Sequence, residues 1–361
     1  MHMEKIQEIA AKYQNKVFKK FINVYQLQYK DFKPPGFGDY LRGCIHMAQV
    51  LRILNKHCGT EATYDMDMSN HPIGKYLDLV PVEPCKNYPA LGNYFIDSLE
   101  VKDDPADVCY QHILDCVIRY FNKVQEETHY AFCCKFQVLA KTEEADKEFI
   151  RSRLVPNAGM RAYIDETMAE LGLATGEFSV IHVRVRDEVS FKTRSPLDAK
   201  RLAGIATALA PHIDPAKKYL LITNHDDIKT HYNGRPNIIS KNTKICHLGQ
   251  DSEPSEEATR DTMLDFFLMA RSNNIVAYSE YNFSGFSLEC SKLYNIPYVV
   301  MGPPKDPPGP PGPPKALPGP PGVAGLPNLE GVSILSPAEM ARLMAMVKPQ
   351  ASPPTNQVRL P

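Results

Sequence analysis

The stretch FSVIHVRVRDE, residues 178–188, decides the fold of this chain. Its first half is apolar and β-branched, which is typical of a strand buried on both faces of a parallel sheet. Polar side chains follow at its carboxyl end, where open α/β sheets bind their ligands. The alternative is an edge strand whose histidine and arginines alternate into solvent. The segment by itself does not separate these two interpretations.

Arg184 and Arg186 favour an anionic ligand at this strand end, and in particular a diphosphate. A guanidinium keeps its charge in any site and presents a planar fork of donors that matches phosphate oxygens. If the strand continues to Val185, the two arginines share one face and Val185 points away from them.

Composition limits the classes of function. The chain has 361 residues, 43% of them hydrophobic, which is enough for a large core. Its 41 basic and 42 acidic residues give a net charge of -1, so no electrostatic case exists for binding nucleic acid or a membrane surface. Nine cysteines without a Cys-x-x-Cys spacing predict reduced thiols. No apolar run of about 18 residues and no signal-peptide pattern occurs, which predicts a cytoplasmic protein without a membrane span.

Strands and helices alternate in both halves of the chain. The pattern predicts an α/β fold with an N-terminal domain over residues 1–150 and a second, Rossmann-like domain over 151–302, facing each other across a cleft. Predicted helices cover residues 1–22, 40–57, 105–124, 158–171, 195–210, 261–271 and 286–294. Predicted strands cover residues 24–29, 61–66, 129–139, 178–185, 218–223, 237–240, 274–279 and 298–301.

The C-terminal part differs in composition. Residues 303–331 are rich in Pro and Gly, but Gly309 and Gly319 are out of phase, which favours a semi-rigid polyproline linker over a collagen stalk. Residues 332–361 are expected to form a helix from Ser336 and a disordered tail. The apolar face of that helix could support oligomerisation.

A glycine-rich loop precedes the helix predicted from residue 40. In the sequence PPGFGDYLRG, residues 34–43, glycines let main-chain N–H groups approach a ligand, and the helix N-terminus behind them favours an anion. Such a turn is also common as a plain tight connection. The loop lacks the third glycine of the dinucleotide fingerprint and the Gly-Lys-Ser/Thr of a P-loop, so nicotinamide redox chemistry and ATP hydrolysis are not supported.

A third segment, residues 261–287, carries polar residues in an apolar setting. Asp261 and Asp265 lie one turn apart on an apolar helix, where a carboxylate needs a partner or can read the N–H groups of a purine. Ser284 and Ser287 follow at a helix start, where hydroxyls and main-chain donors suit phosphate oxygens. Alternatively, Ser284 is an ordinary N-cap and Asp265 a structural ion-pair partner.

Together, the sequences GFGDYLRG, IHVRVRD and DTMLDFFLMARSNNIVAYSEYNFSGFS resemble the three motif regions of the fucosyltransferase superfamily. The first is most similar to that of the nodulation-factor α-1,6-fucosyltransferases, and the resemblance spans residues 30–300 in the expected order. It implies a GT-B-like, inverting glycosyltransferase whose partners are a GDP-sugar donor and a glycan acceptor. It implies no metal and no other cofactor.

The resemblance also implies roles for single residues. Arg184 would bind the β-phosphate and stabilise the leaving diphosphate, while His182 and Asp265 would contact the guanosine. Residues 223–227 match an (S/T)-x-D stretch beside the donor. The expected nucleotide-sugar contacts are Gly36, Phe37, Gly38, Arg42, His182, Arg186, Asn224, Asp226, Asp265, Ser284, Gly285 and Phe286.

The chemistry agrees with this assignment. A fixed arginine beside the leaving diphosphate can replace the divalent cation of other transferases. Asp65 and Asp67 are interpreted as the end of a strand, with a metal or sugar site as the alternative. Inversion calls for a base near the acceptor hydroxyl, and Asp39 and Glu188 are the candidates.

One departure leaves the donor open. Many members of the superfamily have two adjacent arginines, whereas here Val185 separates Arg184 from Arg186. The donor sugar is therefore fucose, a related deoxyhexose, or the sugar of another nucleotide. Two further hypotheses remain. The chain could be a catalytically inactive member that binds a nucleotide or glycan, or a structural protein assembled through residues 303–361.

Overall fold

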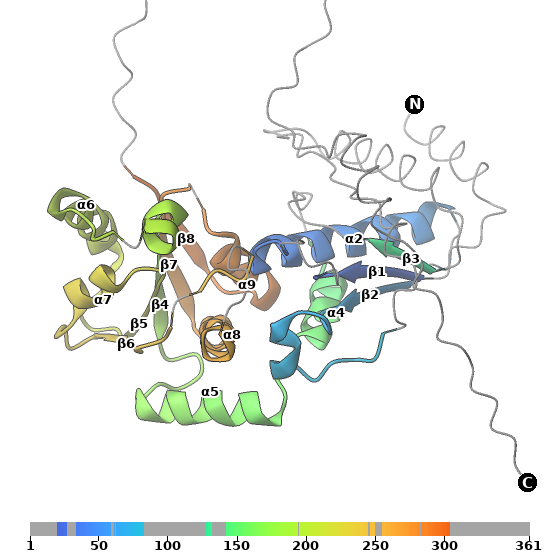
Figure 1. The fold of residues 1–361 in the computed structure, drawn as a ribbon, viewed down its shortest axis with the longest axis horizontal. Helices are drawn as coiled ribbons and strands as arrows, with labels where there is room; N and C mark the ends of the chain where they lie inside the picture. The colour runs from blue at the N-terminus through green and yellow to red at the C-terminus, as the bar shows by residue number, and fades with distance from the viewer. Residues whose placement is uncertain are drawn as a thin grey trace, which may run out of the picture. The chain divides into compact units, whose positions relative to one another are not determined.

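The computed structural model describes residues 20–26, 34–58, 61, 63–82, 128–131, 142–193, 195–244, 246–249, 255–281 and 283–303. The chain divides at residue 304, and all described residues belong to the first unit, Met1–Pro304. The predicted linker beyond residue 303 and the predicted C-terminal helix lie outside the described residues. The first unit contains two parallel sheets with helices between their strands, so the predicted α/β class is confirmed (Figure 1).

The larger sheet has the strand order β6-β5-β4-β7-β8 and is parallel throughout. Its strands are β4 (Ser179–Arg184), β5 (Tyr219–Thr223), β6 (Ile238–Ser240), β7 (Asn274–Ser279) and β8 (Tyr298–Met301). In chain order, this sheet begins with its central strand β4, continues through β5 to the edge strand β6, and is completed on the other side by β7 and β8. Strand order therefore reverses between β4 and β7, which is the switch point of a doubly wound sheet. All five strands predicted for this half are confirmed.

Strand β4 is the central strand of this sheet. His182 pairs with Ile222 of β5 on one side and with Ala277 of β7 on the other. Val183 packs into one hydrophobic cluster, and Val180 packs into a second cluster on the opposite face. The prediction of a buried strand is confirmed, and the edge-strand alternative is wrong.

Helices cover both faces of this sheet (Figure 1). Side chains of α6 (Ala199–Leu209) and α7 (Asp226–Tyr232) join the cluster that contains Val183, whereas α5 (Ala158–Glu170), α8 (Glu256–Ala270) and α9 (Gly285–Tyr294) contribute to the other cluster. The helix predicted to start at residue 195 starts at Ala199, because the Asp198 side chain accepts a hydrogen bond from Arg201 N at 2.7 Å and caps it there. Short α7 was not predicted.

The smaller sheet has the order β2-β1-β3. Its strands, β1 (Lys20–Val24), β2 (Thr63–Asp67) and β3 (Thr128–Ala131), are parallel. The helix predicted over residues 1–22 is wrong at its end, because the sequence KFINV forms β1 and hydrogen-bonds to a strand on each side. Residues 1–19 and the predicted helix over 105–124 lie outside the described residues.

Helix α2 (Phe37–Cys58) connects the two sheets through the core. Phe37 and Leu41 of α2 belong to the same buried cluster as Phe266 of α8 and Leu293 of α9. Helix α4 (Glu144–Arg153) contacts both α2 and α9. The domain boundary predicted at residue 150 falls within α4, and the division into two domains stays a prediction.

The remaining described elements are short. They are the 3-10 helices η1 (Pro72–Tyr76) and η4 (Ala210–His212) and the π-helix η3 (Glu188–Thr193). Cys44, Cys246 and Cys290 are free thiols, as predicted, and burial raises the pKa of Cys44 to about 12. Among the described helices, none combines the length and apolar character needed to cross a membrane.

Candidate functional site

The candidate site lies where β4 and β7 end. Arg184, the last residue of β4, pairs in register with Ser279, the last residue of β7. The chain leaves β4 towards η3 and leaves β7 towards α9. Ligands of doubly wound sheets bind at the carboxyl ends of the strands at such a switch point. The segments 178–188 and 261–287 are therefore adjacent in the structure.

Arg184 is paired with an acid three residues further along the chain. Its guanidinium donates a hydrogen bond to Asp187 Oδ1 and lies 5.5 Å from the centroid of the Phe191 ring. The side chain of Arg184 is 19% exposed. Its charge is thus accessible but already engaged by a carboxylate.

Arg186 is exposed, and its main-chain N donates to Glu280 Oε2 at 2.8 Å. Within the described part of the chain, its guanidinium forms no ion pair. Val185, just beyond β4, is buried in the same cluster as Val183, so strand-like alternation is expected to put Arg186 on the opposite side from Val185, as Arg184 is from Val183. Arg184 at the end of β4 is therefore a paired cation, and Arg186, two residues later, is an exposed cation without an ion pair among the described residues.

His182 lies deeper at the same strand end. It is 5% exposed, its Nδ1 lies 2.8 Å from Ser287 Oγ, and its ring centroid lies 6.2 Å from that of Phe286. Burial, reinforced by the charge of Arg184, lowers the pKa of His182 to about 3. The imidazole is therefore neutral at physiological pH and connects β4 to the first turn of α9.

The glycine-rich loop meets the start of α9. A Cβ added to Gly38 would lie 2.2 Å from Gly285 C, and one added to Gly285 would lie 2.8 Å from Arg42 Nη2. The contact with main-chain atoms requires glycine at position 38, whereas a Cβ at position 285 would meet only the mobile end of the Arg42 side chain. The sequence predicted that these glycines allow close approach to a ligand; at Gly38 the closely approaching atoms belong to α9.

Arg42 and Phe37 contribute to the packing between α2 and α9. Arg42 Nε lies 3.2 Å from Glu289 Oε1, and Arg42 Nη1 lies 3.2 Å from Asp39 Oδ1. Phe37 is 3% exposed and packs edge-on against Phe266, with the two ring centroids 5.1 Å apart. Both residues were expected to contact the nucleotide sugar, and both are occupied by contacts within the protein. Asp39, a candidate base, is one-third exposed.

His247 was missed by the sequence reasoning. Its Nε2 lies 3.7 Å from Asp187 Oδ2, its ring packs edge-on against Phe191 at 5.4 Å, and a Cβ at Gly36 would lie 3.6 Å from its Cε1. Nδ1 accepts a hydrogen bond from Gly249 N at 3.1 Å. His247 thus lies between the glycine-rich loop and the Arg184–Asp187 pair. No motif surrounds it in the sequence, so only its position in the fold indicates its importance.

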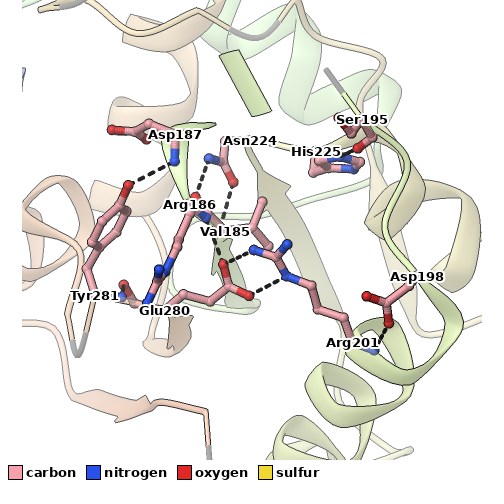
Figure 2. A network of polar contacts seen from close by, with 11 residues as sticks. Val185, Arg186, Asp187, Ser195, Asp198, Arg201, Asn224, His225, Glu280 and Tyr281 are labelled. Carbon is pink, nitrogen blue, oxygen red and sulfur yellow. Dashed lines mark hydrogen bonds and ion pairs between the residues drawn. The ribbon is translucent and has the colours of Figure 1, made fainter. Parts of the chain in front are cut away.

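The residues after β5 have two different environments. Asn224 is buried, and its amide accepts from Val185 N and donates to Val185 O, both at 2.9 Å (Figure 2). Asp226 begins α7 and is 81% exposed, with Oδ1 3.9 Å from Lys229 Nζ. The amide of Asn224 therefore supports the main chain after β4, while Asp226 faces solvent.

The two aspartates of α8 also differ. Asp261 is buried and accepts hydrogen bonds from Tyr163 Oη and Lys244 N, each at 2.9 Å. Asp265 is half-buried. This burial raises its pKa to about 7, although the nearby charge of Lys229 acts in the opposite direction. Asp261 is thus the structural member of the pair. Asp265 can either donate or accept a hydrogen bond near neutral pH.

Four further residues singled out in the sequence are placed as follows. Ser284 precedes α9 and is buried, but its side chain makes no capping bond to the helix. Glu188 is exposed at the start of η3. Asp65 and Asp67 end β2, as predicted; both are buried, with Asp65 Oδ1 2.7 Å from Arg153 Nε and Asp67 Oδ1 2.6 Å from Ser69 Oγ. The described residues contain no group of three or more His, Cys, Asp or Glu side chains that could hold a metal ion.

Comparisons with known proteins gave structural neighbours only. No family model matches the chain, and no curated protein matches it. NodZ α-1,6-fucosyltransferase soaked with GDP-fucose is 15% identical, with a TM-score of 0.44 over 76% of this chain and 92% of that chain. Selenomethionine NodZ from Bradyrhizobium is 16% identical, with a TM-score of 0.46 over 80% and 97% of the two chains. A FUT1 variant from Arabidopsis thaliana in complex with GDP is 11% identical, with a TM-score of 0.46 over 84% and 76%.

Proposed function

We propose that this chain is a glycosyltransferase that moves a sugar, fucose or a related deoxyhexose, from a GDP-sugar to a hydroxyl of a glycan with inversion. The observation that carries the proposal is the position of Arg184 at the end of β4, in register with Ser279 at the end of β7, with Arg186 exposed two residues further along the chain. Two cations at the carboxyl end of a central parallel strand suit a diphosphate. The order of the three sequence motifs supports GDP and fucose as the specific donor.

The leaving group explains why arginines are needed. Breaking the bond between the sugar and the diphosphate develops negative charge on the leaving oxygen, and fixed cations stabilise that charge in the transition state. Arg186 is free to bind the diphosphate, and Arg184 becomes available when the diphosphate competes with Asp187 for its guanidinium. In this mechanism the two guanidinium groups replace a divalent cation.

His182 and Asp265 would bind the donor through hydrogen bonds rather than fixed charges. His182 is neutral because burial lowers its pKa to about 3, and its Nδ1 is engaged by Ser287. Asp265, whose pKa is raised to about 7 by burial, can be protonated when the donor binds. Such neutral hydrogen-bonding groups can discriminate between the nucleobases of different donors without adding further charge to the site.

Glu188 is the better supported of the two candidate bases. It is exposed and begins η3, four residues after Arg184 in the chain, whereas Asp39 is paired with Arg42 at 3.2 Å. A base must reach the acceptor hydroxyl to remove its proton as the bond to the sugar forms. An exposed carboxylate near the diphosphate site meets that requirement when a glycan occupies the surface beside it.

The decisive experiment is a thermal-shift screen against GDP, UDP, ADP and their sugars, followed by turnover assays. At equal concentration, a ligand that binds only the folded protein raises its melting temperature more the lower its Kd, because the stabilisation grows with the logarithm of concentration over Kd. We expect GDP and GDP-fucose to give the largest shift, and Arg184→Ala to abolish turnover. Arg161→Ala is the control, because Arg161 is exposed and pairs with Asp78 away from β4. A shift with GDP and no turnover with any donor would identify a catalytically inactive member; no shift with any nucleotide would refute the proposal.

A further inference from the structure

Side chains extend the hydrogen-bond ladder beyond the end of β4. The last main-chain bond between β7 and β4 runs from Glu280 N to Arg184 O at 3.1 Å. In a parallel ladder the next bond would run from Arg186 N to the main-chain carbonyl of Glu280. Instead, Arg186 N donates to the side-chain Oε2 of Glu280 at 2.8 Å (Figure 2).

The same replacement occurs on the other edge of β4. Asn224 N donates to Val183 O at 3.4 Å, and the next bond runs from Val185 N to the side-chain Oδ1 of Asn224 at 2.9 Å. On the β7 side, Asp187 N donates to the hydroxyl of Tyr281, two residues after the end of β7, at 2.8 Å. Three consecutive main-chain N–H groups, of residues 185–187, are therefore bound by three side chains from the ends of the neighbouring strands.

This arrangement keeps the end of β4 fixed where the sheet opens. Because β5 and β7 have ended, their main chains no longer supply the acceptors. Their side chains supply them, and residues 185–187 continue past the neighbouring strands with their N–H groups satisfied. The main chain that carries Arg186 is consequently held in a fixed position relative to Arg184.

Arg201 of α6 neutralises Glu280. Arg201 Nε donates to Glu280 Oε1 at 2.6 Å and Arg201 Nη2 donates to Oε2, and the Glu280 side chain is only 9% exposed. A buried carboxylate without a counter-ion would attract the nearest cation. With its charge already paired, Glu280 binds the main chain of Arg186 and leaves the guanidinium of Arg186 unpaired.

We propose that Glu280, neutralised by Arg201, is a positioning residue that acts through Arg186 on the diphosphate of the donor. This role rests on the proposed function of the same site. Glu280 itself does not touch the ligand; it fixes the main chain from which the cation extends.

A double-mutant cycle with GDP tests this role. Calorimetry of the full chain gives the Kd of GDP for wild type, Glu280→Ala, Arg186→Ala and the double variant. We expect each single substitution to weaken binding about tenfold, equivalent to about 1.4 kcal/mol, and the double variant to bind no more weakly than Arg186→Ala. If Glu280 had only a structural role, the two losses would add.

Conservative variants separate positioning from folding. Glu280→Gln combined with Arg201→Gln removes both charges but keeps an oxygen that can accept from Arg186 N, so its Kd for GDP should stay within about threefold of wild type. Asp78→Ala removes an exposed acid of the Arg161 pair and should leave the Kd unchanged. Additive losses in the cycle, or a tenfold loss in the double-glutamine variant while its melting temperature is retained, would overturn the positioning role. A wild-type chain that binds no nucleotide would overturn the proposed function first and this role with it.

Discussion

Asp187 holds the guanidinium of Arg184 from three residues further along the chain, and its second oxygen lies 3.7 Å from His247 Nε2. The carboxylate therefore occupies a position that a phosphate oxygen would take on the same arginine. Any anion that binds Arg184 has to compete with this carboxylate.

Removing this competition should strengthen diphosphate binding. In Asp187→Asn the side chain keeps its shape but loses its charge, so Arg184 is released for the ligand. We expect the Kd of GDP or of pyrophosphate to fall severalfold, with a larger effect at low salt because the competition is electrostatic. Calorimetry at two salt concentrations measures this. Weaker binding in Asp187→Asn would show that the carboxylate orients Arg184 rather than competing for it.

Gly38→Ala should destabilise the protein. Its Cβ would lie 2.2 Å from Gly285 C, so the N-termini of α2 and α9 must separate. Overpacking of this kind costs about 1–3 kcal/mol in the free energy of unfolding. Gly204→Ala is the matched control, because Gly204 lies on α6 and a Cβ there has no neighbour within 4 Å. That control should gain about 0.5–1 kcal/mol from helix propensity, and equal effects of the two substitutions in urea unfolding would contradict the contact.

Arg42→Met should destabilise the protein through the acid it leaves behind. The Glu289 side chain is fully buried, and its other cation, Lys292, lies on the same helix at 3.2 Å. Losing one partner of a buried pair costs about 3–5 kcal/mol, and the Lys292 contact should keep the loss near the lower end of that range. Adding Glu289→Gln should recover part of the loss. If the double variant is less stable than Arg42→Met in urea unfolding, the buried charge is not the cause.

The free energy of unfolding should decrease as the pH is lowered from 6.5 towards 3, because of His182. The pKa of His182 is about 3 in the folded state against an ordinary value of 6.5, so the unfolded chain binds a proton there that the folded chain does not. Stability contributed by the neutral ring is therefore complete above pH 6.5 and is lost as pH drops through this window. In His182→Gln the free energy of unfolding should change less between pH 7 and pH 5. Urea unfolding at both pH values measures the difference, and an equal change in variant and wild type would exclude His182 as its source.

The three inner strands of the larger sheet, β4, β5 and β7, could be predicted because their sequences are buried on both faces and are therefore mostly apolar. The helix over residues 1–22 was wrong at its end because apolar residues such as Ile22 suit either period, and the pairing of β1 with two strands decides for the sheet. Such pairing is not visible in a local pattern.

Only part of the candidate site could be predicted from the sequence. Arg184, Arg186 and His182 follow from their position at a strand end. His247 and Glu280 could not be predicted, because their partners are 60 or more residues away in the sequence or belong to the main chain of another strand. Arg42 shows the converse case, since its motif suggested a ligand and the structure pairs it with a buried glutamate.

The shared core of α2, α8 and α9 has a consequence for cooperativity. Phe37 packs against Phe266, so side chains from both sides of the predicted boundary at residue 150 complete one hydrophobic cluster. A fragment cut at that boundary would expose this apolar surface to water. We therefore expect residues 20–303 to unfold in a single transition, as one folding unit that carries two sheets.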